Sequence, residues 1–143
     1  MVLDWQSIFK LILAAVTAAF IGYNREKLDK AAGIRTNVIV AVISCLIMIL
    51  SIRVSKVGID TGMQGGDPAR LAAQVISGIG FLGAGTIIKQ EDKVEGLTTA
   101  ASLWGVAGLG LAIGFGLYDI SLVAAGLIYI SLKISPFVKR KVK

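Results

Sequence analysis

The stretch DPARLAAQVISGIGFLGAGTIIK, residues 67–89, decides the fold. Its segment 71–88 carries no charged residue, and a helix of that length, at about 1.5 Å of rise per residue, nearly crosses a bilayer. Asp67 is placed to cap the first free N–H groups, and Pro68 suits the first helical position, where no N–H donor is needed. The stretch therefore predicts a capped membrane helix.

Glycines give this helix a second property. They lower helix propensity, but they remove bulk where another helix backbone can approach, so they predict close helix packing. Residues 78–83 also match the GxGxxG nucleotide pattern by letter, but no strand precedes them and no helix begins there, which favours packing over a nucleotide loop. The glycines are Gly78, Gly80, Gly83 and Gly85.

Polar residues recur at helical spacing in the first half of the stretch, at Arg70, Gln74 and Ser77. Such a stripe is expected to face protein or water rather than lipid. Capping and an ion pair account for Asp67 and Arg70. Gln74 and Ser77 lie deeper, so they predict a partner inside the protein.

Composition points to an integral membrane protein. The chain has 143 residues, 55% hydrophobic content and a mean hydropathy of +0.79, which fits one domain, 1–143, that is too apolar to be soluble. It has no histidine and a single cysteine, Cys45, so one chain builds no disulfide framework and no Cys/His zinc site. The basic residues flank apolar runs, which indicates membrane orientation rather than nucleic-acid binding.

The apolar runs predict an all-α, polytopic membrane protein with about five transmembrane helices. The first run contains the close-packing line Ala14, Ala18 and Gly22, and Gly105 and Gly108 offer packing positions in the fourth. Residues 90–96, QEDKVEG, predict a tight charged turn, and Pro136 is expected to end the last helix. The five helices are expected at 5–23, 36–52, 71–88, 97–115 and 117–135.

The basic residues also predict an orientation. With five crossings and the N-terminus outside, the loops after the first and third helices and the tail face the cytoplasm. Those segments hold eleven of the fifteen Lys and Arg residues, which favours N-terminus out and C-terminus in. The eleven are Arg25, Lys27, Lys30, Arg35, Lys89, Lys93, Lys133, Lys139, Arg140, Lys141 and Lys143.

The first four helices suggest an internal repeat. The step from Gly22 to Gly33 equals the step from Gly85 to Gly96, and the two steps end alike in GIRT and GLTT. We therefore consider a tandem duplication of a helical hairpin in one orientation, with abundant glycine as the competing explanation.

A polar cluster is expected at the cytoplasmic ends of the helices. There, Glu26 either neutralises an arginine, or the arginines meet lipid phosphate or helix C-terminal carbonyls. The simpler interpretation is that these arginines are interfacial anchors. The residues of this cluster are Arg25, Glu26, Arg35, Thr36, Asn37, Thr98 and Thr99.

Catalysis and a resident metal are not predicted. Without an acidic residue in the middle of any predicted helix, a midplane carboxylate site for magnesium is not available. Without histidine, no credible nucleophile and base are evident, so no enzyme activity and no cofactor are expected.

These residues resemble the membrane domain of the MgtC/SapB family. The similarity lies in GYNRE at 22–26, AGIRT at 32–36, residues 67–89, and GLTTAASLWGVAGLGLAIGFGLY at 96–118. The resemblance covers most of the chain in the family's order. Many family members continue into a soluble ACT-like domain, which does not follow here, so a role of that domain cannot be transferred.

The resemblance implies a bacterial inner-membrane protein tied to magnesium homeostasis, growth at low magnesium and, in pathogens, survival within host cells. It also implies regulatory roles, including interaction with the membrane sector of the F-type ATP synthase. Glycine-rich helices without a midplane acid suit helix association better than conduction of a divalent ion.

The leading hypothesis is an interaction protein that packs against itself, as a homo-oligomer, or against another integral membrane protein. Gly80→Leu or Gly83→Leu is then expected to disrupt folding or assembly. The alternative is a small transporter or channel for magnesium or another ion, with a path across a subunit interface that is lined by Gln74, Ser77 and the threonines of the fourth helix.

Overall fold

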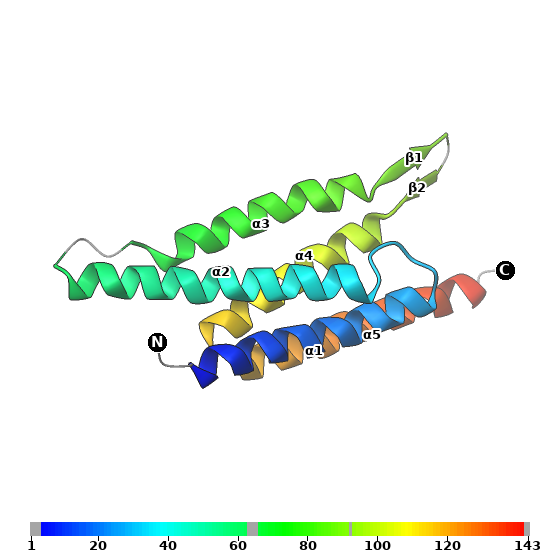
Figure 1. Cartoon of the computed structure of the whole chain (residues 1–143). Coiled ribbons are helices and arrows are strands. Elements are labelled where there is room, and N and C mark those ends of the chain that lie inside the picture. Colours follow the sequence, from blue (N-terminus) through cyan, green and yellow to red (C-terminus); the bar gives the residue numbers. More distant parts are fainter. Residues whose placement is uncertain (1–3, 63–65, 92, 142–143) are drawn as a thin grey trace.

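The structure, a computed structural model, describes residues 4–62, 66–91 and 93–141, with side chains described as far as residue 134. Within these residues the chain forms five helices and one short hairpin (Figure 1), which confirms the all-α fold class. Lys143, one of the basic residues that predict the orientation, lies outside them. The elements are α1 (Trp5–Lys27), α2 (Ile34–Asp60), α3 (Pro68–Gly85), β1 (Ile88–Gln90), β2 (Lys93–Glu95), α4 (Leu97–Phe115) and α5 (Tyr118–Lys141).

Two aspartates begin helices. The Asp4 carboxylate accepts the backbone N–H groups of Gln6 at 3.1 Å and Ser7 at 3.4 Å, and so caps α1. Asp67 accepts the N–H of Ala69 at 2.9 Å, with Pro68 at the first position of α3. The capping predicted for Asp67 is therefore confirmed.

Three helices extend beyond their predicted ends. α1 and α2 continue beyond the apolar runs 5–23 and 36–52, to Lys27 and Asp60. Backbone hydrogen bonding tolerates charged side chains outside the apolar layer, so a drop in hydropathy does not end a helix. α5 also runs past Pro136, which was expected to end it, because one proline removes one backbone hydrogen bond without forbidding the next turn.

The predicted charged turn contains a hairpin. α3 ends at Gly85 instead of residue 88, and the Thr86 hydroxyl donates to the carbonyl of Gly83 at 2.8 Å. The antiparallel strands that follow pair Ile88 with Glu95, Lys89 with Val94 and Gln90 with Lys93. Strands of three residues with mixed charge give no alternating apolar pattern, so the sequence did not reveal them.

α2 and α4 form the centre of the bundle. α1 packs against α2, α5 lies along α1 and α4, and α3 lies on the opposite side against α4 and α2 (Figure 1). α3 contributes only Ile79 to the buried hydrophobic core among the described residues. α5 contributes only Ala125 from its described residues, so α3 and α5 supply the fewest of these core side chains. The remaining core residues are Ala14, Ala18, Ile21, Val40, Ala41, Cys45, Ile49, Leu103, Val106, Ala107, Leu109, Ile113 and Ala125.

The bundle has two distinct ends. The Asp4 end holds the start of α1, the end of α2 and the start of α3, and the Arg25 end holds the end of α1, the starts of α2 and α4, and the hairpin (Figure 1). The chain termini lie at opposite ends. α1 and α3 run in the same direction, as the repeat hypothesis requires, but the compact loop after α1 differs from the hairpin after α3. The repeat remains a hypothesis.

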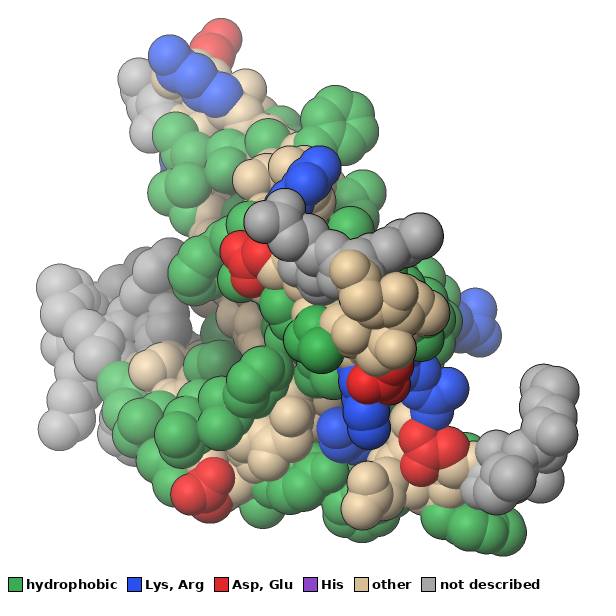
Figure 2. Space-filling model, turned by 90° about the vertical axis from the view of Figure 1, so that its left-hand side faces the viewer, with side chains coloured by type: hydrophobic (Ala, Val, Ile, Leu, Met, Phe, Trp, Pro, Cys, Tyr) green, Lys and Arg blue, Asp and Glu red, His purple; other side chains and the backbone are tan. Residues whose placement is uncertain are grey.

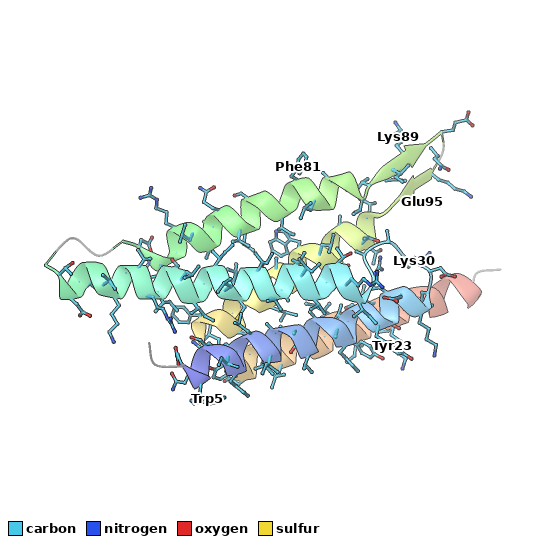
Figure 3. All side chains as sticks on the ribbon, in the orientation of Figure 1. Trp5, Tyr23, Lys30, Phe81, Lys89 and Glu95 are labelled. Atoms are coloured by element: carbon cyan, nitrogen blue, oxygen red, sulfur yellow. The ribbon has the colours of Figure 1, made fainter. Side chains whose placement is uncertain are left out.

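The surface suits a lipid environment. In the described part of the chain, α1, α2 and α4 are long and apolar enough to cross a membrane, so the full count of five crossings remains a prediction. Trp5 and Tyr23, 74% and 59% exposed, lie near opposite ends of α1 (Figure 3), as expected for membrane-interface aromatics. Figure 2 views the Asp4 end, where charged side chains are set within a largely hydrophobic surface.

Candidate functional site

Arg25 is the central polar residue of the Arg25 end. It comes from the last turn of α1, is only 5% exposed, and its Nη2 donates to the hydroxyl of Thr99 in the first turn of α4. Its Nε is buried and has no hydrogen-bond partner in the described structure. This arginine is thus an internal residue that joins α1 to α4, which differs from an interfacial anchor.

Glu26 does not neutralise an arginine. Its carboxylate accepts the backbone N–H of Ile34 at 2.9 Å and so caps α2, where the N-cap residue Gly33 has no side chain to do this. The close approach of α1 and α2 depends on Gly22, because a Cβ there would lie 2.7 Å from the Cα of Ile34. The alternative in which Glu26 pairs with Arg25 or Arg35 is therefore wrong.

Three other predicted members of this cluster lie at the surface. Arg35 and Thr36 are exposed and line a surface hollow of about 460 Å³ with Glu26 and Lys30. Thr98 is exposed in the first turn of α4, unlike its buried neighbour Thr99. The structure thus brings Arg25 and Thr99 together and leaves Arg35, Thr36 and Thr98 outside their contact.

Asn37, which was also predicted in this cluster, is fully buried. Its Nδ2 donates to the carbonyls of Ala32 at 2.6 Å and Gly33 at 2.8 Å, while its Oδ1 is buried without a partner in the described structure. An amide buried one turn into α2 has to bond within the protein, which accounts for these contacts.

The polar stripe of α3 faces away from the bundle. Arg70, Gln74 and Ser77 are exposed, and at 100° per residue they lie opposite Ile79 and Gly83, the buried residues of α3. The internal partner expected for Gln74 and Ser77 is absent from the described structure, so that expectation is wrong. An ion pair between Asp67 and Arg70 is likewise absent there, and the Asp67 side chain instead caps α3.

Figure 3 shows the outward direction of the same face. Phe81, which continues the stripe one turn after Ser77, points away from the other helices and is 83% exposed. Together Arg70, Gln74, Ser77 and Phe81 define the outer face of α3. An amide and a hydroxyl on the outside of an otherwise apolar helix are the least expected feature of this fold.

The predicted packing glycines fall into two groups. Gly22, Gly83 and Gly105 lie against other helices: a Cβ at Gly83 would lie 3.5 Å from Ala100 Cβ, and one at Gly105 would lie 3.2 Å from Ile128 Cδ1. A Cβ at the other predicted positions would meet nothing within 4 Å in the described structure. Those positions are Gly78, Gly80, Gly85 and Gly108.

The tightest helix crossing involves two glycines that were not predicted to pack. A Cβ at Gly110 would lie 2.9 Å from Ser44 Cβ, and one at Gly114 would lie 2.6 Å from the carbonyl oxygen of Cys45. Both contacts are between α4 and α2. The GxxxG spacing of Gly110 and Gly114 is the sequence signal that identifies such a crossing.

These contacts predict different effects for Gly83→Leu and Gly80→Leu. We expect Gly83→Leu to reduce stability by about 1–3 kcal/mol, because the side chain would extend past Cβ into Ala100. Gly80→Leu should leave the melting temperature of the purified protein nearly unchanged, because space is open there. Thermal unfolding in one detergent tests both variants, and equal losses would contradict this arrangement of α3.

The Asp4 end is held by a separate polar group. Arg53 pairs with Asp4 and donates to the Ser7 hydroxyl at 2.9 Å, and the hydrogen bond from Ser7, with that from Arg53, lowers the pKa of Asp4. Lys10 donates to the carbonyl of Gly114 at 2.9 Å, which places a cation at the C-terminal end of α4. No local pattern in the sequence pairs residues so far apart.

No group of three Cys, Asp or Glu side chains gathers to hold a metal in the part of the chain that the structure describes. The polar groups found there are instead a buried arginine with a threonine, helix caps, and a stripe exposed on α3. Chemically, this arrangement provides hydrogen-bond donors and a surface for contact with another helix.

Known proteins are similar in sequence to this chain over most of its length. The MgtC family model matches residues 11–141. Protein SapB of Bacillus subtilis is 41% identical over 99% of the chain and 63% of its own length, and the Escherichia coli K12 protein named "Putative magnesium transporter YhiD" is 40% identical over 89% and 59%. Protein MgtC of Salmonella typhimurium LT2 is 39% identical over 82% of the chain and 47% of its own length.

The chain spans between 47% and 63% of the length of these curated relatives. No solved structure matches it. The matched region nevertheless runs from α1 to the end of α5 and contains Arg25, Thr99, the outer face of α3 and the GxxxG crossing. With the family model covering nearly the whole bundle, the chain belongs to the MgtC family.

Proposed function

We propose that this protein is a regulatory membrane protein linked to magnesium homeostasis and adaptation to low magnesium, and that it acts by packing against another membrane helix. The partner helix belongs to a second copy or to another membrane protein, such as the membrane sector of the F-type ATP synthase. The observation that carries the proposal is the outer face of α3, where polar side chains point away from their own bundle.

Polar side chains on that face gain from being covered. Gln74 has two amide donors and a carbonyl acceptor, and Ser77 has a hydroxyl that donates and accepts. Lipid chains offer no partner for these groups, whereas a neighbouring helix does. Interhelical hydrogen bonds of this kind contribute about 0.6–2 kcal/mol each in membranes.

The backbone of α3 also permits close approach. Gly78 and Gly85 flank Phe81 on the outward side, and nothing in the described chain lies within 4 Å of a Cβ at either glycine. A partner helix can therefore pack against backbone there, with Phe81 beside it. Small residues beside polar ones are the usual composition of membrane helix interfaces.

The link to magnesium comes from relatives. The Escherichia coli relative carries magnesium transport in its name, and the resemblance to the MgtC/SapB family implies growth at low magnesium. The same resemblance supports a bacterial inner-membrane location, and the charge distribution supports an N-terminus outside. Virulence in a pathogen is part of this proposal only through the family resemblance.

A matched pair of serine variants tests the interface. Ser77 and Ser131 are both exposed serines on long helices, but only Ser77 lies on the outer face of α3. We expect Ser77→Leu to weaken association roughly 3- to 30-fold, while Ser131→Leu leaves it unchanged. Purification in mild detergent, the mass of the complex and mass-spectrometric identification of co-purifying membrane proteins give the readout.

The outcomes are distinct. A larger complex that shrinks with Ser77→Leu but not with Ser131→Leu supports the interface and identifies the partner. A wild-type chain that runs as a monomer and retains no membrane protein contradicts it. Magnesium flux into proteoliposomes that contain only this protein, abolished by Gln74→Leu, would instead support transport, the alternative that the name of the Escherichia coli relative favours.

A further inference from the structure

The position of Arg25 is electrostatically unusual. Its side chain reaches the first turn of α4 and contacts Thr99, although the N-terminal end of a helix carries partial positive charge. The last turn of α1 offers partial compensation, since its carbonyl end favours a cation. A guanidinium that is 95% buried beside the positive end of α4 still has an unmatched charge.

No carboxylate of the described residues supplies the matching charge. The ion pair found there joins Arg53 to Asp4 at the other end of the bundle. Glu26, adjacent to Arg25 in sequence, is directed to the backbone of Ile34. The buried Nε of Arg25 also has no hydrogen-bond partner, and buried donors without partners are rare in folded proteins.

The first turn of α4 adds more donors. Gly96 caps this helix without a side chain, so the free N–H groups of the first turn receive no side-chain acceptor. Leu97 and Thr98 are exposed, which leaves the start of α4 open from outside the bundle. A guanidinium, a hydroxyl and free backbone N–H groups are a donor set that suits a phosphate.

We propose that the Arg25 end binds a phosphate group between the last turn of α1 and the first turn of α4. Arg25 supplies charge and N–H donors, the Thr99 hydroxyl donates a hydrogen bond, and the start of α4 supplies backbone N–H groups. The phosphate belongs either to a lipid headgroup, which lies at the level of helix ends, or to inorganic phosphate. The two sources share the same chemistry and differ in how they reach the site.

Thermal unfolding of the purified full chain tests the site. The probes are sodium phosphate against sodium chloride at equal ionic strength, and phosphatidylglycerol against diacylglycerol, which lacks phosphate, in the same mixed micelles. The variants are Arg25→Gln and Thr99→Val, with Lys27→Gln as the matched control. Lys27 is an exposed cation in the same last turn of α1, so its loss changes net charge equally.

We expect wild type and Lys27→Gln to melt at higher temperature with a phosphate-bearing probe, and to bind it on the order of 10- to 100-fold more tightly than Arg25→Gln does. Without phosphate, Arg25→Gln should be at least as stable as wild type, because it removes an unmatched buried charge. Thr99→Val should show an intermediate loss. A response to sodium phosphate identifies the free anion, and one confined to phosphatidylglycerol identifies the lipid.

Two results with wild type and Arg25→Gln would overturn the proposal. One is an equal response of wild type and Arg25→Gln to every probe, and the other is the lack of any response in wild type. If Arg25→Gln fails to fold, Arg25→Lys keeps the charge and loses the planar donor fork, so it should retain a weakened response. An undiminished response in Arg25→Lys and Thr99→Val together would also contradict the site.

Discussion

Gly110→Leu is expected to abolish the folded bundle or to destabilise it by about 3 kcal/mol or more. A Cβ at Gly110 would collide with the carbonyl of Ala41 and lie 2.9 Å from Ser44 Cβ. A carbonyl inside α2 cannot move aside as a flexible side chain can, so the two central helices would have to separate. Thermal unfolding in detergent and the yield of monodisperse protein measure the effect.

Gly108→Leu is the matched control on the same helix. A Cβ at Gly108 meets nothing within 4 Å, and the residue borders an apolar hollow of about 440 Å³ between α2, α3 and α4. The same substitution two residues away should therefore preserve the folded protein. If both variants lose stability equally, the crossing of α2 and α4 does not lie at Gly110 and Gly114.

The crossing of α2 and α4 could not be located from the composition of the helices. The residues of α4 itself are largely apolar on every face of the helix. Its composition therefore does not distinguish the face that meets α2 from the face that meets lipid. The packing positions predicted in this helix were Gly105 and Gly108, and did not include Gly110 and Gly114. Only the spacing of glycines carries the information, because a close crossing needs small residues one turn apart.

The outer face of α3 shows a second limit. The spacing of Arg70, Gln74 and Ser77 correctly placed them on one stripe of α3. The further inference, that deep polar side chains in a membrane helix have a partner inside the chain, was wrong, because the stripe faces away from the bundle. In a complete assembly such polar side chains are expected to meet protein. That protein is either the same chain or another one, and the sequence of a single chain does not decide between the two.

Local signals were more informative than long-range ones. The cap of α3 follows from Asp67 and Pro68 because all the atoms involved lie within one turn. The contact of Arg25 with Thr99 joins residues 74 positions apart, and that of Lys10 with Gly114 joins residues 104 apart. Such contacts depend on how whole helices pack, which no local pattern encodes.

Gly96→Ala is expected to reduce stability by about 2–3 kcal/mol or more, since two separate effects add. Gly96 has φ +87°, a left-handed conformation that costs a residue with a Cβ roughly 1–2 kcal/mol. The new Cβ would also lie 2.7 Å from the carbonyl carbon of Thr86 and 3.1 Å from Ile87 Cα. Neither backbone atom can retreat easily, because α3 ends just before them and β1 begins just after.

Gly85→Ala separates this conformational effect from a general effect of glycine loss. Gly85 closes α3 with open space around it, so alanine there should be neutral or stabilising by up to about 1 kcal/mol through helix propensity. For a chain of this size, a difference of about 3 kcal/mol between the variants corresponds to roughly 6–12 °C in melting temperature. Equal melting temperatures would mean that the hairpin does not return against the end of α3, and the first turn of α4, with Thr99, would then lose its fixed position beside Arg25.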